Sequence, residues 1–307
     1  MSTTPANEPA CKGTQDREID LVIEGRPRGV DSMTVARLLP SPKRRMIGPF
    51  IFVDHMGPVT LPPEVGFDVR PHPHIGLSTI TYFFAGENVH RDSLGNVRTN
   101  RPGDVNLMTA GGGIVHSERA APAFRASGGE MHGLQIWVAL PESLEDAPPS
   151  FEHHPEATLP NISPAPGVTG RVLFGAAFGA QSPIKHPSTP LLVELRFEAG
   201  ASLEIPSDID ERGVLVIEGA LQNGTETLAT NQLGVLCSQR RPAMTASEPT
   251  HAVLLGGAAH PPRFIEWNFV ASSRERIERA RDRWKAREFP AIPGDDKEFI
   301  PWPENLR

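Results

Sequence analysis

The chain has 307 residues, a formal net charge of −7 and 38% hydrophobic residues. This length exceeds one ordinary core and predicts two domains of about 130–150 residues each. The acidic balance disfavours a broad nucleic-acid-binding surface, because such binding depends on neutralising phosphates. The two cysteines, Cys11 and Cys237, exclude a disulfide framework and favour a reducing compartment.

The N-terminal residues 1–17 are polar, with scattered proline and glycine, and we expect a disordered tail there. Met1 is not followed by the basic and apolar stretches of a secretory signal. No uninterrupted apolar run approaches the roughly 18 residues of a membrane span. We therefore expect a cytoplasmic protein that contacts no membrane.

The frequent proline and glycine residues predict many turns and short strands. The glycine cluster at 111–113 lacks the lysine and the following helix of a phosphate loop, and it indicates tight backbone packing instead. Residues 18–145 are predicted to form a first β domain. Residues 146–188 are predicted as a linker with connecting strands, and residues 189–307 as a second β domain with a helical tail.

Two short pairs carry the chemistry of the first domain: His72-Pro-His74 and His116-Ser-Glu118. Residues two apart on a strand share a face. If two such strands face each other across a barrel, three imidazoles and one carboxylate come together. That donor set suits a divalent first-row metal and leaves coordination positions for water, O2 or substrate. A single histidine would more often be structural, so the prediction depends on both pairs.

The second domain repeats the pattern of the first without these ligands. A strand ending at Gly86 and a turn at Gly103 are echoed at Gly219 and Gly234, which indicates a duplicated β-barrel. The positions that correspond to the four candidate ligands in the second copy are Ile205, Ser207, Ser247 and Pro249. Residues required for the fold would be expected in both copies. The four candidate ligands occur in the first copy alone, which favours a functional site in the first domain.

One helix is predicted near the C-terminus. Ser272 is predicted as its N-cap with Glu275 completing a capping box, and Pro290 as its end. Helical spacing of Ile277, Ala280 and Trp284 predicts an apolar face that docks on a barrel.

The sequence resembles the pirin family of the cupin superfamily, in particular bacterial pirins of the quercetin 2,3-dioxygenase type. The matching text is RMIGPFIFVDHMGP (45–58), RPHPHIG (70–76), HRDSLGN (90–96), RPGDVNLMTAGGGIVHSE (101–118) and MHGLQIWV (131–138). The resemblance continues through the tail at 264–303 and covers nearly everything after about residue 18.

The resemblance implies an all-β bicupin fold: two antiparallel β-barrels of jelly-roll type with a short C-terminal helix. It implies iron, Fe(II), held in the first barrel by His72, His74, His116 and Glu118; Mn, Cu, Co, Ni or Zn stay open as alternatives. Ser78 and Ile75 depart from the family, which usually has Glu and Arg there. The serine is expected to alter hydrogen bonding near the metal, and the isoleucine to remove a charge at the pocket mouth.

Three functions stay open at this point. The first is a quercetinase, which opens a flavonol or similar enol with O2 and releases carbon monoxide and a depside; Glu118 would accept the hydroxyl proton. The second is a non-enzymatic iron protein that regulates a protein partner, without direct contact to nucleic acid. The third is a metal that serves stability alone. A deep cavity beside His72 and His116 would favour the enzyme. The sequence is compatible with a monomer.

Overall fold

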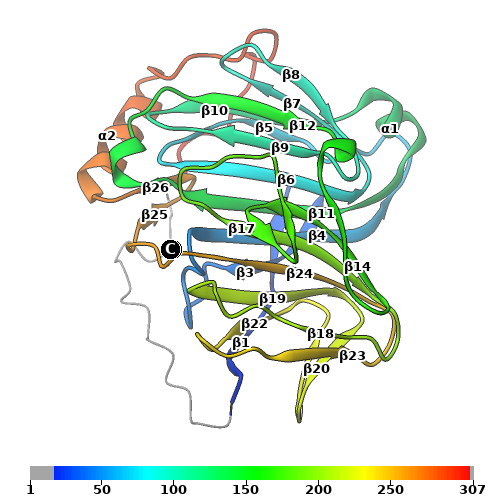
Figure 1. Cartoon of the computed structure of the whole chain (residues 1–307). Helices are drawn as coiled ribbons and strands as arrows, with labels where there is room; N and C mark the ends of the chain where they lie inside the picture. Colours follow the sequence, from blue (N-terminus) through cyan, green and yellow to red (C-terminus); the bar gives the residue numbers. More distant parts are fainter. Residues whose placement is uncertain (1–16, 305–307) are drawn as a thin grey trace.

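The computed structural model describes residues 17–304, which fold into four stacked β-sheets (Figure 1). Two seven-stranded sheets lie in the middle, and a four-stranded sheet covers the outer side of each. The first half contains an outer sheet of β5 (Val69–His74), β10 (Ile114–Ala120), β7 (Asn88–Asp92) and β8 (Val97–Asn100). Its inner sheet contains β12 (Ser150–His154), β9 (Val105–Thr109), β6 (Leu77–Ala85), β11 (Gly129–Ala139), β4 (Phe50–Leu61), β3 (Met33–Leu39) and β2 (Arg26–Val30).

The second half repeats this arrangement. Its inner sheet contains β1 (Ile19–Glu24), β22 (Gln232–Leu236), β19 (Glu211–Glu218), β24 (Thr250–Gly257), β17 (Leu191–Phe197), β14 (Val168–Phe174) and β13 (Asn161–Ala165). Its outer sheet contains β18 (Ser202–Glu204), β23 (Ala243–Ala246), β20 (Ala220–Asn223) and β21 (Glu226–Ala229). The remaining elements are short: β15 (Ala176–Ala177), β16 (Ala180–Gln181), β25 (Phe264–Glu266), β26 (Phe269–Ala271), α1 (Pro122–Ser127), α2 (Arg274–Lys285) and the 3₁₀ turns η1 (Glu142–Leu144) and η2 (Glu156–Thr158).

The largest apolar cluster lies between the two inner sheets. Phe50 and Ile136 contribute to it from the first sheet, and Leu215 and Val253 from the second. Each of these side chains is completely buried, and burial of one such side chain stabilises the fold by about 1.5–3 kcal/mol. The described part of the chain is therefore mostly β, in two halves that share one core. The closed jelly-roll barrels stay a prediction.

The sheets cross the domain boundaries predicted from the sequence. β1 pairs with β22 in the second half, although it precedes every strand of the first. Within residues 146–188, β12 joins the first inner sheet and β14 the second. The boundaries at 18–145, 146–188 and 189–307 stay a prediction. Of the predicted N-terminal tail, residues 1–16 lie outside the described part of the chain.

The C-terminal segment returns to the first domain and docks there through α2. Ile277, Ala280 and Trp284 are buried, which confirms the predicted apolar face. The predicted cap was wrong by one residue: the Ser273 side chain accepts a hydrogen bond from the Arg276 N–H, whereas the Ser272 hydroxyl donates to Glu145. Ala286 forms the C-cap, so the helix ends before the predicted stop at Pro290. Among residues 17–304, no helix has both the length and the apolar character that a membrane crossing requires.

Candidate metal centre

The two predicted ligand pairs lie on neighbouring strands. β5 and β10 form an antiparallel ladder in which His116 pairs with His72 and Ile114 pairs with His74. A register shift between His116 and Glu118 marks a β-bulge. The expectation that the two strands would face each other across a barrel was wrong, since they are adjacent in one sheet. The outcome for the histidines is the same, because i, i+2 side chains on neighbouring strands also share one face.

The three histidines converge on one point. One ring nitrogen from each histidine lies within 4.8 Å of those of the other two, and His74 Nε2 is 3.1 Å from His116 Nε2. No other group of this kind occurs among residues 17–304. His72 Nδ1 lies 2.9 Å from the Arg70 carbonyl, and His74 Nδ1 lies 3.0 Å from the Asn268 carbonyl. A carbonyl only accepts, so both Nδ1 atoms carry the proton and both Nε2 lone pairs are free for a metal.

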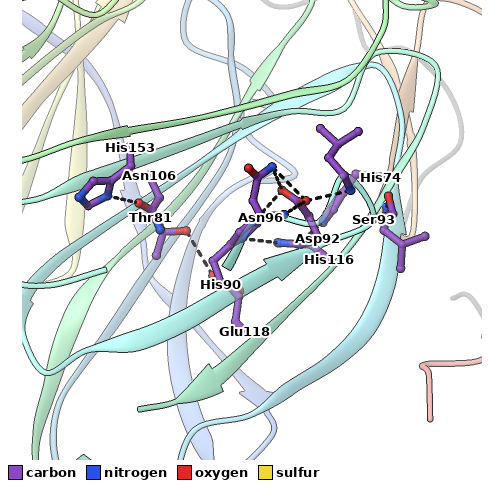
Figure 2. Close-up of polar contacts among 12 residues, drawn as sticks. His74, Thr81, His90, Asp92, Ser93, Asn96, Asn106, His116, Glu118 and His153 are labelled. Atoms are coloured by element: carbon purple, nitrogen blue, oxygen red, sulfur yellow. Dashed lines mark hydrogen bonds and ion pairs between the residues drawn. The ribbon is translucent and has the colours of Figure 1, made fainter. Parts of the chain in front are cut away.

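The third histidine is oriented by a chain of side chains on β7 (Figure 2). His116 Nδ1 lies 3.4 Å from His90 Nδ1, and His90 Nε2 lies 3.0 Å from Asp92. The Asp92 carboxylate also accepts hydrogen bonds from Asn96 and from the Leu94 N–H. Because a carboxylate requires the proton on His90 Nε2, His90 Nδ1 accepts from His116 Nδ1. All three metal-facing nitrogens are then Nε2 lone pairs.

The electrostatics agree with this assignment. Burial lowers the pKa of His72 to about 4 and lowers the pKa values of His74 and His116 well below the ordinary range. Their rings are therefore neutral near pH 7, which is the form that binds a metal. Three buried neutral imidazoles with fixed Nε2 lone pairs fit a divalent first-row metal.

Glu118 is buried beside the histidines but is not part of the three-histidine group. Thr81 and Asn88 donate hydrogen bonds to its carboxylate, over 3.2 Å and 3.3 Å (Figure 2 shows the Thr81 contact). Burial raises the pKa of this carboxyl, although His90 and the two donors oppose the rise. Its role as a fourth ligand stays a prediction.

A cavity of about 210 Å³ opens beside the histidines. His72, His74, His116 and Glu118 line it together with Arg37, Asp54, Gln135 and the rings of Phe52, Phe67 and Trp137. Trp267, Asn268 and Ile300 line it from the C-terminal segment. Most of the lining is apolar, with a few polar groups at fixed positions, as in small-molecule sites generally.

Several residues that orient the histidines or line the cavity were not predicted from the sequence. His90 and Asp92 form an i, i+2 pair opposite Glu118 and His116 in the β7–β10 ladder, and the sequence spacing was a usable signal for them. Trp267, Asn268 and Ile300 carried no such signal, because they lie 195 to 228 residues after His72 in the sequence. The predicted tight packing at the glycine cluster is confirmed: a Cβ on Gly111 would collide with the Ala147 carbonyl.

The two departures from the family pattern lie away from the cavity. The Ser78 hydroxyl contacts Thr109 and His186, at 2.8 and 3.0 Å, and no metal-facing histidine. Ile75 packs with Phe269 and Trp284 under α2 and does not line the metal cavity. The expectations of altered hydrogen bonding at the metal and of a lost charge at the pocket mouth were therefore wrong.

Comparison with known proteins agrees with this geometry. The profile described as Pirin matches residues 32–138, and the profile described as Pirin C-terminal cupin domain matches residues 192–290. A pirin-like protein from Caulobacter vibrioides is 44% identical over 291 residues, which are 93% of this chain and 100% of the relative. The chain belongs to the pirin family.

Two solved structures extend the comparison. A quercetin 2,3-dioxygenase from Acinetobacter baumannii superimposes with a TM-score of 0.85 and 32% identity, over 94% of this chain and 97% of that one. The bacterial pirin YhhW from Escherichia coli, in complex with nickel(II), shares the fold with a TM-score of 0.61 and 15% identity, over 78% and 99%. The pirin profile spans all four predicted ligands as well as His90 and Asp92.

Proposed function

We propose that this pirin is a metal-dependent dioxygenase of the quercetin 2,3-dioxygenase type, acting on a flavonol or a similar enol-like substrate with O2. The observation that carries the proposal is the cavity of about 210 Å³ directly beside three buried histidines whose Nε2 lone pairs are free. The similarity to the quercetin 2,3-dioxygenase from Acinetobacter baumannii supports it.

The residues would divide the work as follows. His72, His74 and His116 would hold the metal, Fe(II) by preference, with Glu118 as a fourth ligand. A bound metal of this kind supplies Lewis acidity and a site for O2. The apolar and aromatic walls exclude water and orient a planar substrate beside the histidines.

Glu118 is the candidate proton acceptor. A flavonol becomes electron-rich toward O2 once its 3-hydroxyl loses its proton, and the buried Glu118 carboxylate lies at the cavity wall where that hydroxyl would enter. Burial raises the pKa of this carboxyl and so makes it a stronger base than an exposed glutamate. Thr81 and Asn88 hold it in place through their hydrogen bonds.

The alternative of a purely regulatory iron protein receives less support. A regulator needs a surface that responds to the metal, whereas the histidines here are buried and face a cavity with aromatic walls. A metal that serves stability alone is also less well supported, since structural sites tend to be closed and this one borders open space.

The test is anaerobic reconstitution with Fe(II), followed by O2 consumption on addition of quercetin. We expect one metal per chain and metal-dependent uptake of O2. A His72→Ala variant is the matched control, and it should lose both. A chain that holds one iron and consumes no O2 with quercetin would contradict the dioxygenase and favour the regulatory protein.

A further inference from the structure

A row of polar side chains crosses the inner sheet at the floor of the cavity. Thr81 on β6 pairs with Gln135 on β11, Gln135 with Asp54 on β4, and Asp54 with Arg37 on β3. The row begins at Glu118, because the Thr81 hydroxyl lies 3.2 Å from that carboxylate and 3.1 Å from Gln135 Oε1. Neighbouring strands are about 4.8 Å apart, so the row spans roughly 14 Å from β6 to β3.

The far end of the row is an ion pair. Arg37 donates from Nε and Nη2 to the two oxygens of Asp54, over 2.8 Å each. Both side chains line the cavity, and they are only 15% and 5% exposed. The bidentate contact uses two of the five guanidinium N–H groups, and no other hydrogen bond of this guanidinium occurs among residues 17–304. The pair therefore has zero net charge and spare donors and acceptors.

Aromatic side chains line the cavity along the same row. Phe52 and Trp137 pair in the β4–β11 ladder, and their rings stack with centroids 4.0 Å apart and planes inclined by 13°. The Arg37 guanidinium carbon lies 4.4 Å from the centroid of the Phe52 ring. Trp267 lines the cavity from the C-terminal segment. Aromatic side chains in a cavity wall favour an aromatic ligand, which they can contact through ring edges or faces.

We propose that Arg37 and Asp54 form a specificity subsite for a hydroxyl group at the distal end of an elongated, planar aromatic substrate. The inference rests on the proposed function, in which the enol end of the substrate lies at the histidines. A hydroxyl can donate to an Asp54 oxygen and accept from an Arg37 N–H at the same time. A carboxylate can pair with Arg37 only and is repelled by Asp54, and an ammonium can pair with Asp54 only and is repelled by Arg37. A phenol is the group that satisfies both members of the pair, so we expect the pair to favour it.

The binding test compares two flavonols on the full-length Ni(II)-loaded chain under anaerobic conditions by calorimetry. Quercetin carries distal hydroxyls, and 3-hydroxyflavone carries only the enol hydroxyl. We expect quercetin to bind roughly 10- to 100-fold more tightly, the range expected for a lost hydrogen bond to a charged group. In the double variant Arg37→Met, Asp54→Leu, the two affinities should become nearly equal. Replacing both partners leaves no unpaired buried charge.

The control is a second ion pair that lies away from the cavity. Arg171 Nη2 and Glu156 Oε1 are 2.6 Å apart, and neither residue lines the cavity. The double variant Arg171→Met, Glu156→Leu should keep the full preference for quercetin. A second test changes the ligand and leaves the protein unchanged. Quercetin methylated on its distal hydroxyls should bind the wild-type chain no better than 3-hydroxyflavone.

The outcomes separate this inference from the proposed function. Equal binding of both flavonols by the wild-type chain, or an unchanged preference in the folded Arg37/Asp54 variant, would overturn the subsite and leave the dioxygenase intact. Binding of neither compound would also overturn it. A preference for quercetin that the Arg37/Asp54 variant loses, in a chain whose Fe(II) form consumes no O2, would support the subsite and contradict the dioxygenase.

Discussion

Asp92 lies directly opposite His116 in the β7–β10 ladder, and His90 joins the two side chains. The carboxylate fixes the proton on His90 Nε2 and thereby leaves His116 with its proton on Nδ1. Orientation of a metal-binding histidine by a carboxylate is normally direct; here a second imidazole stands between the two.

The variant Asp92→Asn tests this hydrogen-bonded path from Asp92 through His90 to His116. An amide can donate to His90 Nε2, which would move the His90 proton to Nδ1 and oppose the His116 Nδ1–H. His116 would then carry its proton on Nε2, where it cannot bind a metal. We expect Ni(II) affinity, measured by competition with a chromophoric chelator, to fall about 10- to 100-fold. The control is Asp104→Asn, whose carboxylate accepts from the Glu156 N–H and touches none of the three histidines. Unchanged Ni(II) affinity in the folded Asp92→Asn protein would show that Asp92 does not orient His116 through His90.

Glu118 is tested by truncation. Removing its carboxylate takes away the proposed fourth ligand and the proton acceptor, and it removes an acceptor of the Thr81 hydroxyl and of the Asn88 amide. We expect Glu118→Ala to lose iron or turnover with quercetin, measured by metal analysis and O2 uptake. Ser207→Ala, at the corresponding position of the second domain, should retain both. Iron content and turnover at wild-type level in the Glu118→Ala protein would refute the site assignment.

The centre of the metal site could be predicted from the sequence because strand periodicity is local. Two residues that are two positions apart on a strand share a face whatever the strand order is. This holds for His72 with His74 and for His116 with Glu118. Their arrangement on adjacent strands could not be predicted, because strand order is a long-range property. The same limit explains why β1 was not expected in the second half: it pairs with β22, more than 200 residues away.

The cavity wall was beyond sequence reasoning for a related reason. The Asn268 carbonyl that orients His74 belongs to the backbone, so no residue type signals it. Docking of the C-terminal segment is nevertheless specific: a Cβ on Gly76 would collide with the Val270 carbonyl. The error at Ser272 has a local cause, since two adjacent serines can both cap and the ion-paired Glu145 recruits the first.

Acid is expected to destabilise the metal-free protein through buried histidines outside the metal site. Burial lowers the pKa of His186 to about 4, whereas an unfolded histidine titrates near 6.5. Between these values the unfolded chain binds the extra proton, so stability falls as pH falls from about 6.5 to about 4. The contribution of His186 is on the order of 3 kcal/mol. Urea unfolding at several pH values should show that the free energy of unfolding falls less with decreasing pH in His186→Gln than in the wild-type protein. Parallel pH profiles of the two proteins would contradict this.

Tyr82 is expected to couple the two halves of the molecule. Its hydroxyl donates to Glu194 Oε2 over 2.5 Å, from β6 in the first inner sheet to β17 in the second. Burial opposes ionisation of Glu194, but the hydrogen bonds from His251 and Tyr82 bring the pKa of its carboxyl to about 2. Tyr82→Phe removes one of these donors from a buried carboxylate and should lower the free energy of unfolding by about 1–3 kcal/mol.

The control Thr245→Val removes an exposed hydroxyl contact with Ser202 and should change the free energy of unfolding by less than about 0.5 kcal/mol. Because Tyr82 does not line the metal cavity, Ni(II) affinity should stay at the wild-type value. Equal stability of the Tyr82→Phe and wild-type proteins in urea would show that the carboxylate finds sufficient partners within its own half.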